Sequence, residues 1–139
     1  MNLFLVVAAF LSALAAALHV GCIIFGAPWY RFFGAGERMA QLASAGSLVP
    51  SVVTLGIAAV LALWSWYALS AAGVGPQLPF VRLVLCGAAS VYLLRGLAGF
   101  PLAAYGLGRS TAFWLWSSVV CLVIAGVHIV GLAQLWSRL

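Results

Sequence analysis

Residues 48–72, LVPSVVTLGIAAVLALWSWYALSAA, decide the fold of this chain, because they form one long apolar run without a charged side chain. No Asp, Glu, Lys or Arg occurs anywhere between Arg38 and Arg82. At about 1.5 Å of rise per residue, a helix of this length exceeds the roughly 30 Å hydrocarbon core of a bilayer. An open strand would leave its backbone N–H and C=O groups unpaired in lipid, so the run is predicted to be a membrane-spanning helix.

Three further apolar runs, at residues 2–27, 80–100 and 111–136, repeat this pattern. Of the 139 residues, 67% are hydrophobic and 5% are charged, against about 25% charged in ordinary soluble domains. Six arginines and one glutamate cannot form the polar shell that a small soluble domain needs. The sequence therefore predicts an all-α membrane protein, in which residues 1–139 form a single domain of four transmembrane helices in an up-down bundle.

The connection at residues 28–41 holds three of the charged residues and four aromatic ones. Pro28 is expected to end or kink the first helix, and residues from Glu37 onward are expected to start a short interfacial helix. Trp and Tyr side chains favour the headgroup level. The expected interface anchors are Trp29, Tyr30, Trp114, Trp116 and Trp136.

The third apolar run is the least regular, because Arg95, Gly96, Gly99 and Pro101 interrupt it. A proline inside a helix removes a backbone hydrogen bond and favours a break or a kink. We expect this span to end near Phe100, or to kink there and continue toward the following turn.

The formal net charge of +5 does not indicate a nucleic-acid-binding protein. Such proteins gather their basic residues on one face or along one helix, whereas the six arginines here are scattered and mostly lie near the ends of apolar runs. Arginines in such places anchor helix ends in headgroups. Membrane lipids are the expected partners, and no nucleic acid is expected.

Arg95 and Glu37 are the first candidates for a functional site. A charge at membrane depth costs about 2.5–3.5 kcal/mol on insertion scales, so Arg95 is expected to find a partner or a wet cavity, or to reach the headgroups. Glu37 is the only acidic side chain, and we expect it to pair with Arg95 if the 28–41 connection folds back. In the alternative, Glu37 begins the interfacial helix or pairs with Arg38.

His19 and His128 raise the possibility of a shared haem or metal, but their depths argue against joint ligation. His128 lies about 26 Å from the 28–41 side and His19 about 12 Å, counted along ideal helices. Each imidazole is expected to hydrogen-bond inside the bundle. Tyr92 and Arg31 complete the binding or ion-pair candidates, and no metal, cofactor or catalytic residue is predicted.

Four segments carry a resemblance to a known group of proteins: WYRFFGAGE at 29–37, YALS at 67–70, YLLRG at 92–96 and FWLW at 113–116. Together they resemble small four-span bacterial inner-membrane proteins. The resemblance implies a bacterial inner-membrane setting and no particular activity. The chain is also similar in size to small multidrug-resistance exporters, but it lacks their acidic residue in the middle of the first span.

Two classes of function fit these residues. The first is a non-enzymatic membrane protein: a transporter or channel-like protein, a binder of small hydrophobic molecules, or an accessory subunit, forming a homo-oligomer or part of a larger membrane complex. The second is a membrane-embedded enzyme acting on a lipid or isoprenoid. Catalysis needs a positioned acid or base or a metal, so one carboxylate and two histidines at unequal depth favour the first class.

The arginines predict the orientation of the chain. Arg31, Arg38 and Arg109 fall on one side of the predicted membrane and Arg82 and Arg138 on the other. The positive-inside rule places the side with more arginines in the cytoplasm, with both termini outside. Reporter fusions after the last residue and in the 73–79 connection should both report the outer side, and a cytoplasmic signal from both would contradict this orientation.

Overall fold

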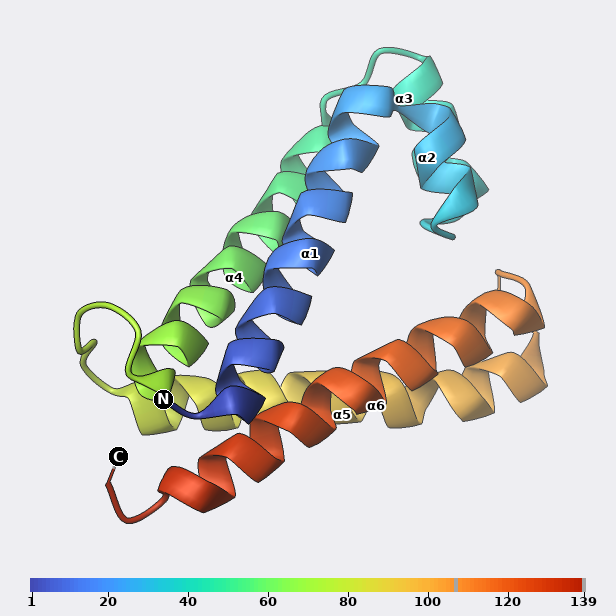
Figure 1. Cartoon of the computed structure of the whole chain (residues 1–139). Coiled ribbons are helices and arrows are strands. Elements are labelled where there is room, and N and C mark those ends of the chain that lie inside the picture. Colours follow the sequence, from blue (N-terminus) through green and yellow to red (C-terminus); the bar gives the residue numbers. More distant parts are fainter. Residues whose placement is uncertain (107, 139) are drawn as a thin grey trace.

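The computed structural model describes residues 1–106 and 108–138 of the chain, and these residues form six helices (Figure 1). Their bounds are α1 (Leu3–Phe25), α2 (Ala27–Phe32), α3 (Glu37–Ser44), α4 (Val49–Ala72), α5 (Val81–Tyr105) and α6 (Thr111–Leu135). By length and composition, α1, α4, α5 and α6 can each cross a membrane. The prediction of an all-α protein with four packed membrane helices is confirmed.

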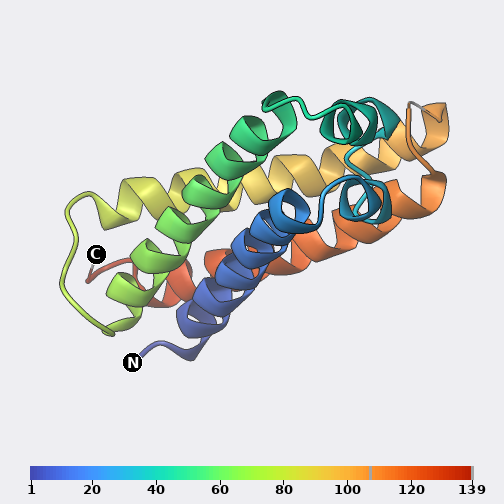
Figure 2. The same ribbon diagram turned by 90° about the horizontal axis from the view of Figure 1, so that it is seen from above.

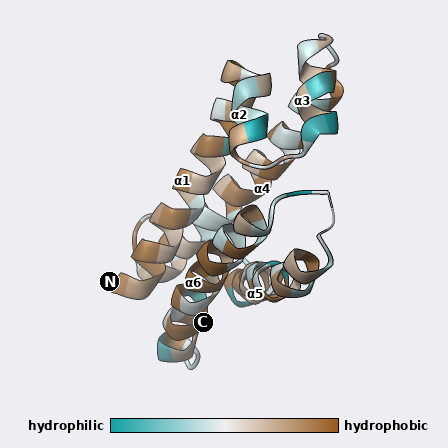
Figure 3. Cartoon of the chain, turned by 90° about the vertical axis from the view of Figure 1, so that its right-hand side faces the viewer, coloured by the Kyte–Doolittle hydropathy of each residue, from teal (hydrophilic) through white to brown (hydrophobic). Residues whose placement is uncertain are grey.

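The four long helices are arranged as two antiparallel pairs, α1 with α4 and α5 with α6. The pairs meet where both termini and the α4–α5 connection lie, and they diverge toward α2 and α3 (Figures 1 and 2). We call these two ends of the molecule the terminal end and the α2–α3 end. Hydrophobic residues cover the long helices, and hydrophilic ones gather on α3 and near the connection to α2 (Figure 3).

The buried clusters follow this divergence. At the terminal end, one cluster draws residues from all four long helices, including Leu5, Ala68, Leu85 and Leu132. A second cluster around Tyr92 still joins all four helices near their middle. At the α2–α3 end, the third cluster is built by α1, α2, α3 and their connections alone. The two helix pairs therefore share a core over only part of their length.

Small residues bring α1 close to its neighbours. Ala8, Ser12 and Ala16 share one face of α1 and are all buried, as expected where helices approach closely. The Ser65 hydroxyl of α4 donates a hydrogen bond to the Ala9 carbonyl of α1 over 2.8 Å. Such bonds between helices help to join them in lipid, where no hydrophobic effect drives association.

Glycines bring α5 and α6 together. A Cβ atom at Gly96 would lie 2.7 Å from the Leu122 side chain, and one at Gly99 would collide with the Ser118 hydroxyl. The two residues recur at i, i+3 on α5, the spacing that presents both to the same neighbour. The seam of this pair therefore depends on missing side chains, and the bare Cα atoms of α5 lie directly against α6.

The first apolar run ends two residues earlier than predicted. Gly26, with φ of 70°, separates α1 from α2, and Pro28 lies in the first turn of α2, where its missing N–H is tolerated. Pro28 therefore starts a helix instead of ending one. The predicted short helix from Glu37 is confirmed as α3.

The third span is longer than the predicted 80–100, because α5 continues through Pro101 to Tyr105. Prolines are tolerated in membrane helices, where neighbouring helices and local adjustments satisfy the freed carbonyl. The extra turn places Arg95 well inside the helix and not near its end.

The glycine seam predicts the effect of one added methyl group. Gly99→Ala should destabilise the protein by about 1–3 kcal/mol, the usual cost of overpacking, because the carbonyl of Trp114, 3.0 Å from the added Cβ, cannot move away easily. Gly87→Ala is the control, because a Cβ at this position of α5 meets nothing within 4 Å. Thermal unfolding in detergent measures both variants, and equal stability of the two would contradict the seam.

Candidate functional site

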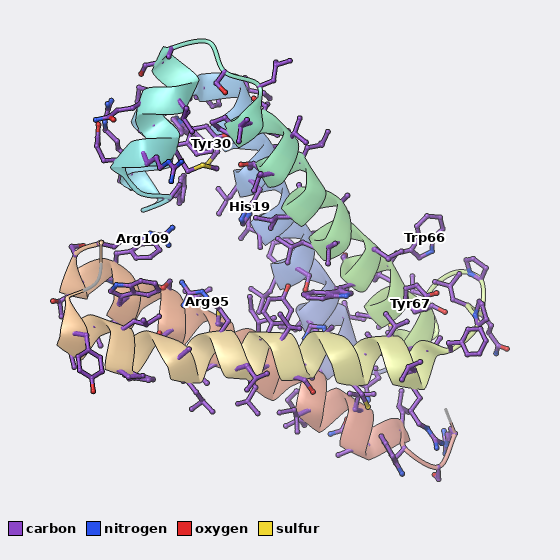
Figure 4. All side chains as sticks on the ribbon, turned by 180° about the vertical axis from the view of Figure 1, so that it is seen from behind. His19, Tyr30, Trp66, Tyr67, Arg95 and Arg109 are labelled. Carbon is purple, nitrogen blue, oxygen red and sulfur yellow. The ribbon has the colours of Figure 1, made fainter. Side chains whose placement is uncertain are left out.

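Arg95 lies inside α5, ten residues before the helix ends at Tyr105, or about 15 Å along the helix axis. Its side chain points from the α5–α6 pair toward the space between the pairs, as does that of Arg109, with His19 and Tyr30 across that space (Figure 4). Because the pairs diverge toward the α2–α3 end, these side chains lie where the shared core is absent. The candidate site is therefore the region between the pairs at that end.

The guanidinium of Arg95 is held by α6 but is not fully satisfied. Its Nη2 atom donates to the Ser117 hydroxyl over 3.0 Å, and its Cζ atom lies 5.1 Å from the ring centre of Trp114. Its Nη1 atom is buried and has no hydrogen-bond partner among the described residues. A buried donor left without a partner costs about 1–3 kcal/mol, and more when the group is charged. This atom can therefore donate a hydrogen bond to an anion.

Glu37 does not supply that anion. Its carboxylate accepts hydrogen bonds from Arg31, with Nη2 2.9 Å from Oε1 and Nε 3.0 Å from Oε2. The predicted pair with Arg95 is therefore wrong, because Arg31 is only six residues away and the turn between α2 and α3 brings the two together. This ion pair is exposed, and the hydrogen bond from Arg31 lowers the pKa of Glu37 while that of Arg31 is raised.

Arg109 is a second cation of the site. It lies between α5 and α6, and its Cζ atom is 5.4 Å from the same Trp114 ring and 4.9 Å from the ring of Phe113. Its Nη2 atom donates to the Ala35 carbonyl over 3.0 Å. Burial, and then the positive charge of Arg95, lower the pKa of Arg109. The two guanidinium groups therefore repel each other, with one indole in contact with both.

Sequence reasoning does not identify Arg109 or Ser117 as site residues. The signal available for Arg109 is that it is the only charged residue between Arg95 and Arg138, in the turn that joins two apolar runs. Ser117 carries no such signal, because serines are common in membrane helices as hydrogen-bonding and packing residues.

A hollow on the Arg109 side of the site lies where the α2–α3 turn meets the start of α6. Gly34 lies so close to the Phe113 ring that a Cβ atom there would collide with it, and the Arg109–Ala35 hydrogen bond lies beside this contact. A cavity of about 290 Å³ opens here, with Arg31, Glu37, Arg109 and Phe113 among its lining residues. Both charged groups of the exposed ion pair and one cation of the site therefore face the same hollow.

Tyr92 lies one turn deeper along α5 and closes the space between the pairs from below. Its hydroxyl is 3.0 Å from that of Ser12 on α1, and its ring makes an edge contact with Trp64 of α4 at 5.3 Å. The His128 ring of α6 packs against it at 5.5 Å. Tyr92 thus contacts all three other long helices, and these contacts hold its side chain in place next to the site.

The two histidines are not brought together. The Nδ1 atom of His19 is 2.7 Å from the Ala15 carbonyl, and that of His128 is 2.9 Å from the Ile124 carbonyl. His128 is fully buried, and its Nε2 atom has no hydrogen-bond partner among the described residues. In residues 1–106 and 108–138, no three His, Cys, Asp or Glu side chains gather into a group that could hold a metal ion.

The predicted interface anchors have different environments. Trp116 and Trp136 are exposed on the outer surface of α6 and just after it, with 72% and 50% of their surface accessible. Tyr30 is only 2% exposed, and its hydroxyl donates to Thr54, so it is a core residue and not an anchor. Trp29 stacks on Phe25 at 4.5 Å, and Trp114 belongs to the site.

Comparisons with protein-family models, with curated proteins and with solved structures find no match to this chain.

The Arg31–Glu37 pair predicts how the α2–α3 turn responds to acid. A carboxyl group whose pKa is lowered in the folded state stabilises that state above its unfolded pKa, and this contribution is lost as the pH falls through the lower, folded value. The turn should therefore stay protected down to about pH 4.5, the ordinary pKa of a glutamate, and loosen progressively below it. Hydrogen exchange of the amides in residues 31–44 measures this, after correction for the intrinsic pH dependence of exchange.

Two variants complete this test. Glu37→Gln should show the loosened turn at every pH, because an amide cannot form the ion pair. Arg38→Gln leaves the pair intact and should behave like the unmodified chain. A turn in Glu37→Gln that is as protected as in the unmodified chain at neutral pH would show that the pair does not hold it.

Proposed function

We propose that this chain is a non-enzymatic protein of the bacterial inner membrane that binds an amphiphilic molecule by its anionic group, between the α1–α4 and α5–α6 pairs. The observation that carries the proposal is the buried Nη1 atom of Arg95, which has no hydrogen-bond partner among the described residues. The bacterial setting is supported by the sequence resemblance alone.

The charge balance of the site favours an anion. Arg95 and Arg109 both contact Trp114, and the carboxylate of Glu37 is engaged by Arg31. Charged side chains at membrane depth mark substrate pathways and binding sites in many membrane proteins, because their cost is tolerated only where they have a task. An anion between the pairs would give the Nη1 atom of Arg95 the partner that the described residues do not provide.

The shape of the molecule favours an amphiphile. The pairs diverge at the α2–α3 end, where their shared core has ended. Trp114 lies in the first turn of α6, so an anionic group held between it and Arg95 would lie inside the span, toward its α2–α3 end. Hydrocarbon attached to that group would extend into the apolar region between the helices or into the surrounding lipid.

Binding is favoured over catalysis by the kinds of groups present. Ser117, Trp114 and Arg109 surround Arg95, and none of them exchanges protons readily near neutral pH. General acid–base catalysis requires a group that does so within hydrogen-bond reach of the substrate. The arrangement is suited to holding and releasing an anion, in transport or as an accessory subunit.

Removal of the Arg95 charge tests the proposal. The unmodified protein, extracted in mild detergent, should retain an anionic amphiphile that native mass spectrometry detects. Arg95→Gln should bind this amphiphile at least about tenfold more weakly, the usual effect of losing a hydrogen bond to a charged group. Arg82→Gln is the matched control, because Arg82 also contacts a tryptophan, with Cζ 4.6 Å from the Trp136 ring, and donates to a backbone carbonyl. Equal retention by all three proteins would contradict the proposal.

A further inference from the structure

We infer that the anionic group recognised at this site is a phosphomonoester carried by a lipid, and that Arg95 and Arg109 share its two negative charges. This inference rests on the proposed function and names the class of ligand. It assigns Arg109 the role of distinguishing a dianionic headgroup from a monoanionic one.

Two positive charges lie close together at the site. The Cζ atoms of Arg95 and Arg109 lie 5.1 Å and 5.4 Å from the centre of one indole ring, that of Trp114. Arginine side chains remain protonated in proteins, so the site carries a charge of about +2. The only acidic side chain of the sequence is bound by Arg31. A carboxylate or a phosphodiester, with one negative charge, would neutralise only one of the two arginines.

A phosphomonoester matches the guanidinium donors of the site in charge and in number of acceptors. A phosphomonoester carries a charge of about −1.5 to −2 at pH 7 and offers three strong acceptor oxygens. The buried Nη1 atom of Arg95 is one donor that such an oxygen could use, and guanidinium groups bind phosphate oxygens in a planar, bidentate manner. A dianion placed between two guanidinium groups would also remove the repulsion that now acts between them.

The site lies among apolar helices, and these surroundings favour a lipid over free phosphate. Trp114 is the fourth residue of α6, about 4.5 Å along the axis from the start of the helix. A phosphate bound beside it would therefore lie toward one end of the spans, and the helices around it are apolar enough to span a bilayer. Free phosphate would gain nothing from these apolar walls, whereas an alkyl chain would gain about 0.8 kcal/mol for each CH₂ group that it buries.

The test compares probes that differ in one property at a time. Dodecyl phosphate carries the proposed dianionic group, methyl dodecyl phosphate is the monoanionic diester with the same alkyl chain, and inorganic phosphate lacks the chain. Each probe is titrated into the purified full-length protein in nonionic detergent at about pH 7.5, above the second pKa of a phosphomonoester near 6. Isothermal titration calorimetry gives the dissociation constants.

The unmodified protein should bind dodecyl phosphate at least about tenfold more tightly than the diester, as expected for one additional charged hydrogen-bonding pair. Arg109→Gln should lose this preference and still bind both amphiphiles. Arg109→Lys keeps the charge and should retain most of the preference for dodecyl phosphate. A loss seen in the glutamine variant alone is then due to the missing charge. Arg82→Gln should match the unmodified protein.

The outcomes separate this inference from the proposed function. If Arg109→Gln keeps the full preference for dodecyl phosphate, the assignment of a phosphomonoester to Arg109 is wrong while the binding function stands. If inorganic phosphate binds as tightly as dodecyl phosphate, the ligand is free phosphate and the lipid assignment is wrong. If Arg95→Gln binds every probe as the unmodified protein does, the proposed function itself fails.

Discussion

The rest of the structure depends on one constraint, which is that no backbone N–H or C=O group can remain unpaired in hydrocarbon. The constraint makes each of the four apolar runs a helix, since a helix alone satisfies its backbone within one segment. The lipid also removes the usual reason for helices to associate, because it is as apolar as the helix surfaces. Close packing and a few side-chain hydrogen bonds must then join the helices, and each polar group inside the bundle has to be accounted for.

The two pairs meet this need in different ways. The α1–α4 pair uses alanine and serine, with Ser65 bonded to the Ala9 carbonyl, while the α5–α6 pair uses Gly96 and Gly99. Among the described residues, the cluster around Tyr92 is the buried cluster nearest the α2–α3 end that draws on all four long helices. Beyond that level, α2 and α3 fold onto α1 and provide a core of their own. The pairs diverge over this part of their length (Figure 1).

Hydropathy could predict the four spans and the helix from Glu37, because those features follow from local composition. It could not decide whether α5 ends near Phe100 or continues through Pro101, since the outcome depends on how neighbouring groups satisfy the freed carbonyl. It also could not predict the partner of Glu37. Both Arg31 and Arg95 fell on the same side of the membrane, and the choice between them was made by the tight turn around Gly34 and Gly36, where φ is 70° and 95°. Tyr30 was predicted to be an interface anchor, but the packing of α2 onto α1 buries it. Local composition does not show this packing.

Arg95 could be named as a candidate from the sequence alone, because a charge inside an apolar run is conspicuous in such a chain. What the structure adds is its surroundings: a second arginine on the same indole and a carboxylate that is already engaged. Two like charges in a half-buried site raise the free energy of the empty protein, and an anion that binds only the folded state would lower it in proportion to its affinity and concentration. If the proposed function holds, the electrostatic cost of two neighbouring arginines in the empty site would be the source of its affinity for an anion.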